Sequence, residues 1–455
     1  MSAMANKIEK SLKNNKYDVI VIGGGPAGST FSTLLSEKGH KVLLLEKDHH
    51  PRFHIGESLL PMTLPILEKL GVSEQVEQIG IVKYGAEFNS LIEDNKRETF
   101  YFDFAMDRNH PHAYEVRRSE FDEILFRNAA NKGVECREGT RVSDIAFNYD
   151  DTVSVTAITE DEQTLKLDCQ FLVDASGRES LLSRRKKLKI KSKKHNSSAI
   201  FGHFENVTRR SGKDEGNISM YWFEHGWFWL IPLKDGMMSV GAVCFPEYLK
   251  TRTCSTEEFM RDTINMAPGV CRRMKDATLA GEVRATGNFS YSSSRMYGKP
   301  GENYLLIGDA YAFIDPVFSS GVHIAMSGAE SAATIIDSCL DNPSASRKLL
   351  QQHKSKIDNA LKTFSWLIHR FNSPVIHKLF MAPANNLRIQ EAIISLLAGD
   401  LYRDTPVRSR LFMFKIIYYL MCLKNIPASL ASYRRRKRNI ATVFSGGTTA
   451  QDILD

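Results

Sequence analysis

The 455-residue chain lacks the cysteine patterns that mark disulfide frameworks and zinc sites. Its seven cysteines are scattered, none forms a CxxC pair, and no histidine lies near one with zinc-ligand spacing. Such scatter is typical of a reducing compartment. We therefore expect a cytoplasmic protein with no metal site.

Long apolar runs and strong charge are also missing. No stretch reaches the roughly 20 apolar residues that a membrane span needs, and the Lys-, Asn- and Glu-rich first sixteen residues lack the apolar core of a secretory signal. The net charge is only +7. This excess suits an anionic cofactor or an acidic partner but does not indicate nucleic-acid binding. We expect neither nucleic acid nor a membrane among the partners.

A glycine loop lies near the N-terminus, in VIVIGGGPAGST at 19–30. It follows a predicted buried strand at 17–22 and precedes a predicted helix at 26–38, and a second strand at 41–46 ends in an acid. This order is typical of a dinucleotide-binding β-α-β unit, in which the three glycines permit a tight turn, close approach of a pyrophosphate and close helix–strand packing. The cofactor site is accordingly predicted to include the loop and strand-end residues Gly23, Gly25, Pro26, Ala27, Gly28, Glu46 and Lys47.

Two later segments point to FAD. VDASG at 173–177 and YLLIGDAYAFIDP at 304–316 resemble the segments that complete the FAD site in aromatic-hydroxylase-like flavoproteins. The resemblance implies that Asp309 meets the ribityl and phosphate region and that Arg118, in RSEFD, lies near FAD. A solvated charge that caps a surface helix is the alternative for Arg118.

The remaining chain alternates between short β runs and helical patterns. β runs fill about 140–175 and 197–292, and helical spacing dominates from about 322. With the resemblance above, this order implies an α/β fold of the Rossmann-type GR2/PHBH-like class, with an inserted β-sheet substrate domain and a C-terminal helical cap. The predicted FAD-binding domain is discontinuous. Its ranges are 15–80, 110–180 and 295–340, with a β-sheet layer at 81–109 and 181–294 and a helical region at 341–455.

From about residue 17 to 330 the chain resembles flavin-dependent halogenases. GWFWLIP at 226–232 matches the family's W-x-W-x-I-P, and Lys83 in VKYGAEF occupies the position of the family's essential lysine. RFHIGESLLP at 52–61 resembles the branch that acts on phenols and pyrroles. A second family motif, F-x-x-P-x-x-S-x-G, matches Phe313, Pro316, Ser319 and Gly321.

This resemblance implies a reaction in which reduced FAD, oxygen and halide yield hypohalous acid, which halogenates an aromatic ring by electrophilic substitution. Backbone amides near Ser320 and Gly321 hold the halide, Trp227 and Trp229 separate flavin from substrate, and Lys83 activates the oxidant. Pro316 and Gly321 also border the cofactor, and Ser319 belongs to the catalytic set. A separate flavin reductase is expected, since the sequence shows no second glycine fingerprint for NAD(P)H.

The expected substrate class depends on one departure of this sequence from the pattern of tryptophan halogenases. Tryptophan halogenases have a glutamate before the motif serine, and Phe318 stands there in this chain. The resemblance then favours an electron-rich phenol or pyrrole, either free or tethered to a carrier protein. By residue type alone, three histidines could serve as a base: His112, His203 and His225.

Simpler interpretations stay open. Two tryptophans at spacing two on a strand often form plain core packing, and most lysines are solvated. A flavin monooxygenase or a prenyl-chain reductase would share the scaffold.

A non-catalytic flavoprotein could bind a lipid or a protein partner through the basic C-terminal helices. There, the apolar run at 410–424 and the basic run at 433–438 could form a docking surface, although we expect the apolar run to pack into the core.

Overall fold

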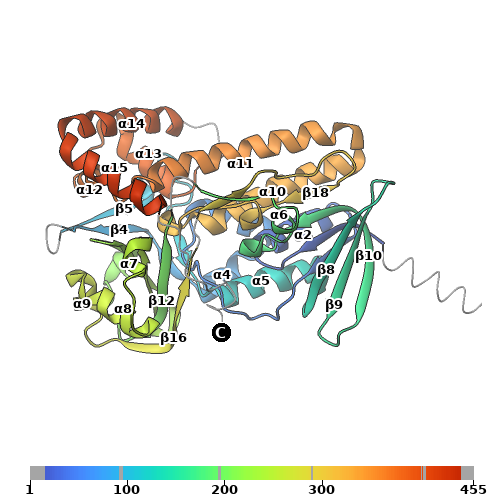
Figure 1. Ribbon diagram of the computed structural model, residues 1–455, viewed down its shortest axis with the longest axis horizontal. Helices are drawn as coiled ribbons and strands as arrows, with labels where there is room; N and C mark the ends of the chain where they lie inside the picture. The colour runs from blue at the N-terminus through green and yellow to red at the C-terminus, as the bar shows by residue number, and fades with distance from the viewer. Residues whose placement is uncertain are drawn as a thin grey trace, which may run out of the picture.

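The computed structural model describes residues 16–91, 96–192, 196–287, 290–400, 402 and 406–441. Two large sheets lie side by side, and a layer of C-terminal helices covers them (Figure 1). The predicted fold class is confirmed, whereas the division into residue ranges stays a prediction.

The first sheet contains the glycine fingerprint. β1, β2, β7, β10 and β18 run parallel, and β9 and β8 extend the sheet antiparallel beyond β10. The parallel strands read as continuous apolar runs because helices cover both faces of such a sheet. Its strands are β1 (Lys16–Ile22), β2 (Val42–Leu45), β7 (Glu135–Arg137), β8 (Thr140–Phe147), β9 (Val153–Thr159), β10 (Thr164–Asp174) and β18 (Tyr304–Leu306).

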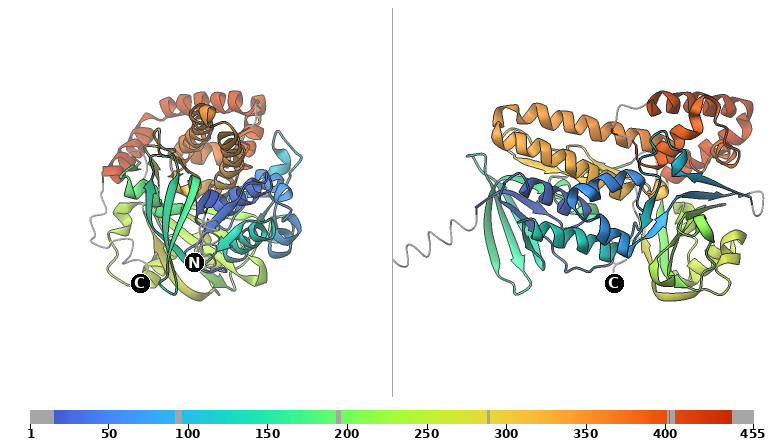
Figure 2. Two further views of the ribbon diagram at one scale, coloured as in Figure 1. Left: turned by 90° about the vertical axis from the view of Figure 1, so that its right-hand side faces the viewer. Right: turned by 180° about the vertical axis from the view of Figure 1, so that it is seen from behind.

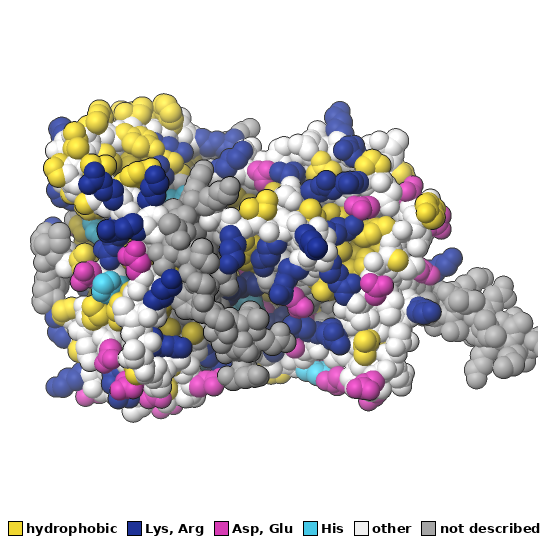
Figure 3. Space-filling view, viewed as in Figure 1, with side chains coloured by type: hydrophobic (Ala, Val, Ile, Leu, Met, Phe, Trp, Pro, Cys, Tyr) yellow, Lys and Arg dark blue, Asp and Glu magenta, His cyan; other side chains and the backbone are white. Residues whose placement is uncertain are grey.

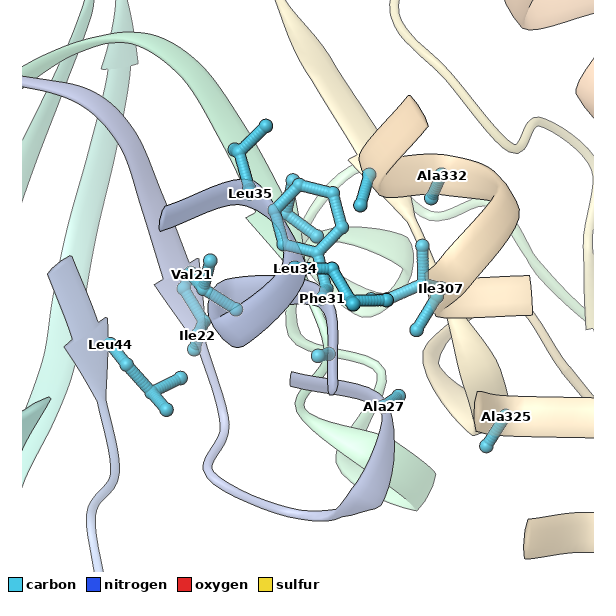
Figure 4. Close-up of a cluster of buried hydrophobic side chains, with 14 of the residues drawn as sticks. Val21, Ile22, Ala27, Phe31, Leu34, Leu35, Leu44, Ile307, Ala325 and Ala332 are labelled. Atoms are coloured by element: carbon cyan, nitrogen blue, oxygen red, sulfur yellow. The ribbon is translucent and has the colours of Figure 1, made fainter. Parts of the chain in front are cut away.

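Helix α2 (Pro26–Ser36) connects β1 to β2 and packs against α10 (Ser320–Asp341). Phe31, Leu34 and Leu35 of α2 lie in one buried cluster with Ile307 and the alanines of α10 (Figure 4). The small side chains of α10 let the two helices approach closely. Ala27, in the first turn of α2, and Ala325, in the second turn of α10, are both close to Gly308. The smaller helices of this half are α3 (Leu64–Leu70), α4 (Ser73–Ile79), α5 (Arg118–Asn131) and α6 (Leu181–Arg185).

The second sheet joins two distant parts of the chain. Its strand order is β16-β12-β15-β14-β13-β4-β5. The pair of β13 with β4 is parallel, and every other pair of neighbouring strands in this sheet is antiparallel. Residues 85–101 thus complete a sheet built mostly from 198–286. Its strands are β4 (Gly85–Asn89), β5 (Arg97–Tyr101), β12 (Ser198–Glu205), β13 (Ile218–Phe223), β14 (Gly226–Pro232), β15 (Met238–Cys244) and β16 (Thr278–Thr286).

Short elements fill the space between and beside the sheets. A two-stranded ribbon pairs β3 (Ile81–Lys83) with β6 (Ala113–Glu115), and Lys83 lies opposite Ala113 in it. A three-stranded sheet joins β11 (Lys189–Lys191), β17 (Tyr291–Ser293) and β19 (Ala312–Phe313). Three helices, α7 (Pro246–Leu249), α8 (Thr256–Asn265) and α9 (Pro268–Arg273), follow β15.

The C-terminal helices form the upper layer. From behind, α10 and α11 lie over the first sheet and the last helices lie over the second (Figure 2). The helices after α10 are α11 (Ser346–Ile368), α12 (Pro374–Met381), α13 (Ile389–Leu397), α14 (Val407–Lys424) and α15 (Ile426–Ala441). Within the described ranges, no single helix combines the length and apolarity of a membrane span; α14 and α15 do so only as a pair, bent by 108°.

Candidate functional site

The glycine loop has the geometry of a pyrophosphate cradle. Gly23 has φ of +103°, and a Cβ there would lie 2.4 Å from the carbonyl oxygen of Ala175. A Cβ at Gly28 would lie 1.9 Å from the carbonyl oxygen of Gly23, so neither position accepts a side chain. At Gly25 the nearest atom is 3.7 Å away, on Arg52, which leaves the backbone open beside the N-terminus of α2. The residues present fit a bound dinucleotide.

Glu46 lies beside this loop and is buried. Its Oε2 accepts a hydrogen bond from the Gly24 amide at 2.7 Å and lies 3.3 Å from an Arg52 guanidinium nitrogen. Lys47, in contrast, forms an ion pair with Glu179 at 2.9 Å and is half-exposed. The sequence interpretation did not name Arg52 as a site residue, although Arg52 begins the segment RFHIGESLLP.

Arg118 is buried, so its interpretation as a solvated helix cap is wrong. It donates two hydrogen bonds to the Asp122 carboxylate, at 2.8 and 3.0 Å, and a third to the carbonyl oxygen of Ile55 at 2.9 Å. Such a bidentate pair fixes the guanidinium. Arg118 thereby holds the backbone at Ile55–Gly56, which leads into the lysine site described below.

Asp309 follows Gly308, which lies close to the start of α2. A Cβ on the preceding Gly308 would lie 3.1 Å from the Ala27 side chain. Burial raises the pKa of Asp309 to about 6, and the charges of Arg178, Arg118 and Lys189 partly offset this rise. The structure therefore brings Asp309, Arg118 and the glycine loop together; their contacts with FAD stay predictions.

The N-terminus of α10 has the features of an anion site. Ser319 adopts a left-handed conformation with φ of +54° and turns the chain from Pro316–Phe318 into the helix. Ser320 is buried, and its hydroxyl has no hydrogen-bond partner within the described part of the chain. A Cβ on Gly321 would meet open space. Free amides and the dipole of a 22-residue helix favour a halide there.

Lys83 is 1% exposed, which overturns its interpretation as a solvated lysine. Its Nζ donates a hydrogen bond to the Ser58 hydroxyl at 2.7 Å and to the Leu59 carbonyl oxygen at 3.1 Å. A carboxylate oxygen of Glu115 lies 3.9 Å away. Burial lowers the pKa of Lys83, and the Glu115 charge partly offsets this effect.

Glu115 completes this group. It is fully buried, and burial raises its pKa to about 7, although the charge of Lys83 opposes the rise. Ser58 donates to Glu115 at 3.2 Å and so connects the lysine and the acid. We call Ser58, Lys83 and Glu115 the lysine triad. The sequence interpretation missed Ser58 and Glu115, although GESLLP had been singled out as a motif.

One of the three candidate histidines reaches this region. His203 lies 2.8 Å from the carboxylate of Glu57, the residue before Ser58. His112 instead packs against Tyr84 and Tyr114, and His225 stacks on Tyr248 at a ring distance of 4.3 Å. A role as base near the triad is thus open to His203 by position.

Trp227 and Trp229 project from one face of β14, with ring centroids 6.0 Å apart. Trp229 donates its indole N–H to Ser239 at 3.1 Å, and Gly241 opposite makes room for its ring. Phe371 packs edge-on against both Trp227 and Phe318. The tryptophans therefore belong to an aromatic core. This geometry is compatible both with a barrier between flavin and substrate and with plain core packing.

One apolar cluster connects the separate parts of the site. It contains both tryptophans, Phe318 just before α10, and Phe102, whose ring centroid lies 5.5 Å from the Lys83 nitrogen. Lys83 and the anion site border this cluster, and the tryptophan pair is part of it. Within the described ranges, no group of three His, Cys, Asp or Glu residues could hold a metal ion.

Comparisons with known proteins identify the family of the chain. Residues 16–363 match the family model described as FAD binding domain. A flavin-dependent halogenase of Armillaria mellea is 35% identical over an alignment of 378 residues that covers 77% of this chain and 71% of that protein. The 1H-pyrrole-2-carbonyl-[peptidyl-carrier protein] chlorinase of Pseudomonas fluorescens is 30% identical over 86% of this chain and 91% of its own length.

A solved structure shows the same relationship. The myxobacterial chondrochloren halogenase superposes with a TM-score of 0.74 at 32% identity, covering 86% of this chain and 92% of that one. The protein is therefore an FAD-dependent enzyme that belongs to the flavin-dependent halogenase family.

Proposed function

We propose that the protein halogenates an electron-rich phenol or pyrrole and that Lys83 directs the oxidised halogen onto the ring. FAD, when bound and reduced by a separate reductase, would supply two electrons that bring oxygen to the oxidation level of peroxide, at which it can oxidise halide to hypohalous acid. The protein's own residues then hold the halide, exclude water and present a hydrogen-bond donor to the oxidant.

The observation that carries this proposal is the buried position of Lys83. Two of its hydrogens are directed to Ser58 and to the Leu59 carbonyl, so the nitrogen is fixed in position. As an ammonium it would donate a hydrogen bond to hypohalous acid and make the halogen more electrophilic. As a neutral amine its nitrogen would attack the halogen of hypohalous acid; the halogen–oxygen bond would break, and the displaced hydroxide would take a proton from the nitrogen and leave as water. Burial favours the amine by lowering the pKa of Lys83. Both routes need a desolvated lysine, which the structure provides.

Two observations support the substrate class. Phe318 is buried where tryptophan halogenases have a carboxylate, so its side chain offers no hydrogen-bond partner for an indole N–H at that position. The Pseudomonas fluorescens relative acts on a pyrrole bound to a peptidyl carrier protein and aligns with 86% of this chain. The substrate panel should therefore include phenols, pyrroles and a carrier-bound pyrrole-2-carbonyl thioester.

The test is product analysis by mass spectrometry. Purified protein is supplied with FAD, a flavin reductase, NADH and each substrate, in chloride, bromide, iodide or no halide. Lys83→Met replaces the ammonium by an apolar chain of similar length, and Lys69→Met is its matched control. Lys69 is 53% exposed and forms an ion pair with Glu330.

We expect a halide-dependent product from the native enzyme and from Lys69→Met. Lys83→Met should lose at least about 100-fold of that product while FAD binding and peroxide release persist. Normal halogenation by Lys83→Met would disprove the role of the lysine. A hydroxylated product that forms without halide would instead support the monooxygenase alternative.

A further inference from the structure

The last two helices expose an unusual amount of apolar surface. Eight of the fifteen large hydrophobic residues that are exposed in the described chain lie on α14 and α15. We call these eight side chains the terminal apolar surface. They are Phe412, Ile416, Tyr419, Leu420, Leu423, Ile426, Leu430 and Tyr433. Singly exposed apolar residues are ordinary, but a contiguous set of this size marks an interaction site.

Helix α14 is apolar on two opposite sides. Val407, Leu411, Phe414 and Tyr418 form a stripe with helical spacing that is buried against the other helices. The second stripe runs through Phe412, Ile416, Leu420 and Leu423 and faces outward. The expectation that this run packs wholly into the core is thus wrong for the outer stripe. A helix with apolar stripes on two opposite sides needs cover on both of them.

The charge of this region has one sign only. Between Val407 and Ala441 the sequence has nine Lys or Arg and no Asp or Glu. In the space-filling view, apolar side chains cover α14 and a row of basic side chains runs beneath them (Figure 3). Arg436 donates to the His369 carbonyl at 3.0 Å and anchors α15, whereas Arg434 and Lys437 are exposed. The surface therefore combines apolar side chains with positive charge.

Against the expectation from the sequence that a membrane is not among the partners, we propose that the terminal apolar surface binds the face of an anionic lipid bilayer, so that the enzyme is a peripheral membrane protein. Interfacial helices have this composition, with apolar and tyrosine side chains at the acyl boundary and Lys or Arg at the headgroups. The outer stripe of α14 contains no polar side-chain atom, whereas a protein interface needs about one hydrogen bond per 100–200 Å². The proposal is independent of the chemistry of Lys83.

Two other occupants fit less well. A second copy of the chain would place two all-positive surfaces opposite each other, and like charges at an interface repel. An acidic carrier protein would satisfy the charge but would have to cover four aliphatic or aromatic side chains without hydrogen-bond partners. A bilayer satisfies both features at once.

The test is sedimentation of the full-length enzyme with large vesicles. One set contains phosphatidylcholine alone, and the other contains about one third phosphatidylserine. The test variant carries Phe412→Gln, Leu420→Gln and Leu423→Gln. The matched control carries Leu91→Gln, Tyr149→Gln and Met266→Gln, three exposed apolar positions that lie between elements elsewhere in the chain.

We expect the native enzyme and the control variant to sediment with the anionic vesicles and to be released by high salt. The test variant should lose at least about tenfold in partitioning, since each replaced side chain removes apolar burial. Equal sedimentation of the test variant, or no sedimentation of the native enzyme, would overturn the proposal. A native dimer that the test variant abolishes and the control variant retains would also overturn it. Binding of the native enzyme to a purified acidic carrier protein, without binding to vesicles, would do the same.

Discussion

The ammonium nitrogen of Lys83 and a carboxylate oxygen of Glu115 lie 3.9 Å apart in the interior of the protein. The Ser58 hydroxyl lies between them, accepting from the lysine and donating to the acid. Both ionisable side chains are almost fully buried. In such an environment the protonation state of each depends on the other, because little water screens their charges.

Glu115→Gln tests this dependence. Glu115 raises the pKa of Lys83 against the lowering effect of burial, so its neutralisation should lower that pKa further. The midpoint of the pH dependence of halogenation should therefore move to lower pH, whichever form of the lysine is active. The measurement is kcat/KM against pH over about pH 5 to 10, where such a profile reports the free enzyme.

The control is Glu115→Asp, which keeps the charge and should restore most of the native profile. A merely structural role would lower activity equally at all pH values in Glu115→Gln. An unchanged midpoint in that variant would contradict the proposed coupling.

Gly321→Ala tests the anion site at α10. A Cβ there meets open space in the structure, so the fold should tolerate it while the methyl group fills part of the halide position. We expect KM for halide to rise by about tenfold, equivalent to about 1.4 kcal/mol, and more for bromide than for chloride. Halide titrations of product formation would measure this change.

Gly328→Ala serves as the control because it lies further along the same helix, where an added Cβ makes an ordinary 3.5 Å contact with Ile357. A halide KM that is unchanged in Gly321→Ala would place the halide elsewhere.

Gly241→Ala tests the packing of the tryptophan pair. The added Cβ would lie 2.2 Å from the ring of Trp229, so the indole must move. Overpacking of this kind costs about 1–3 kcal/mol in the free energy of unfolding. Urea unfolding and tryptophan fluorescence measure the loss and the displacement.

If the pair also separates flavin from substrate, the displaced ring should lower the yield of halogenated product per oxygen consumed. If the pair is only core packing, that yield should remain at the native value while stability falls. Gly328→Ala should change stability by no more than about 1 kcal/mol.

His353→Gln tests the pH dependence of stability. Burial lowers the pKa of His353 to about 4, so the residue is neutral in the folded protein. An unfolded histidine gains a proton below about pH 6.5. The stabilisation is therefore complete above about pH 6.5 and is lost as the pH falls toward 4. The difference between pH 7 and pH 5 is about 2 kcal/mol for one such group.

In His353→Gln, the free energy of unfolding should fall less between pH 7 and pH 5 than in the native protein, by about that amount. Urea unfolding at both pH values measures it. His49→Gln is the control, since His49 is exposed with 55% of its side chain accessible. An equal decline in all three proteins would contradict the prediction.

The sequence determined the parts of this protein that depend on local pattern. Gly23, Gly28 and Glu46 are adjacent in space because a strand, a tight turn and a helix bring them together within one β-α-β unit. The spacing of Trp227 and Trp229 placed both rings on one face of a strand before any contact was known. The composition of 410–424 likewise showed that the helix there is strongly apolar.

Only the tertiary structure decided which residues that are distant in the sequence come into contact. Ser58, Lys83 and Glu115 are far apart in the chain and come together because β3 pairs with β6 and the 55–60 segment lies beside them. No periodicity reports such long-range pairing. The exposure of the outer stripe of α14 was likewise decided by the tertiary structure. Both of its sides are apolar in sequence, and burial depends on which neighbours are present to cover them, which is a property of the packed fold rather than of the helix.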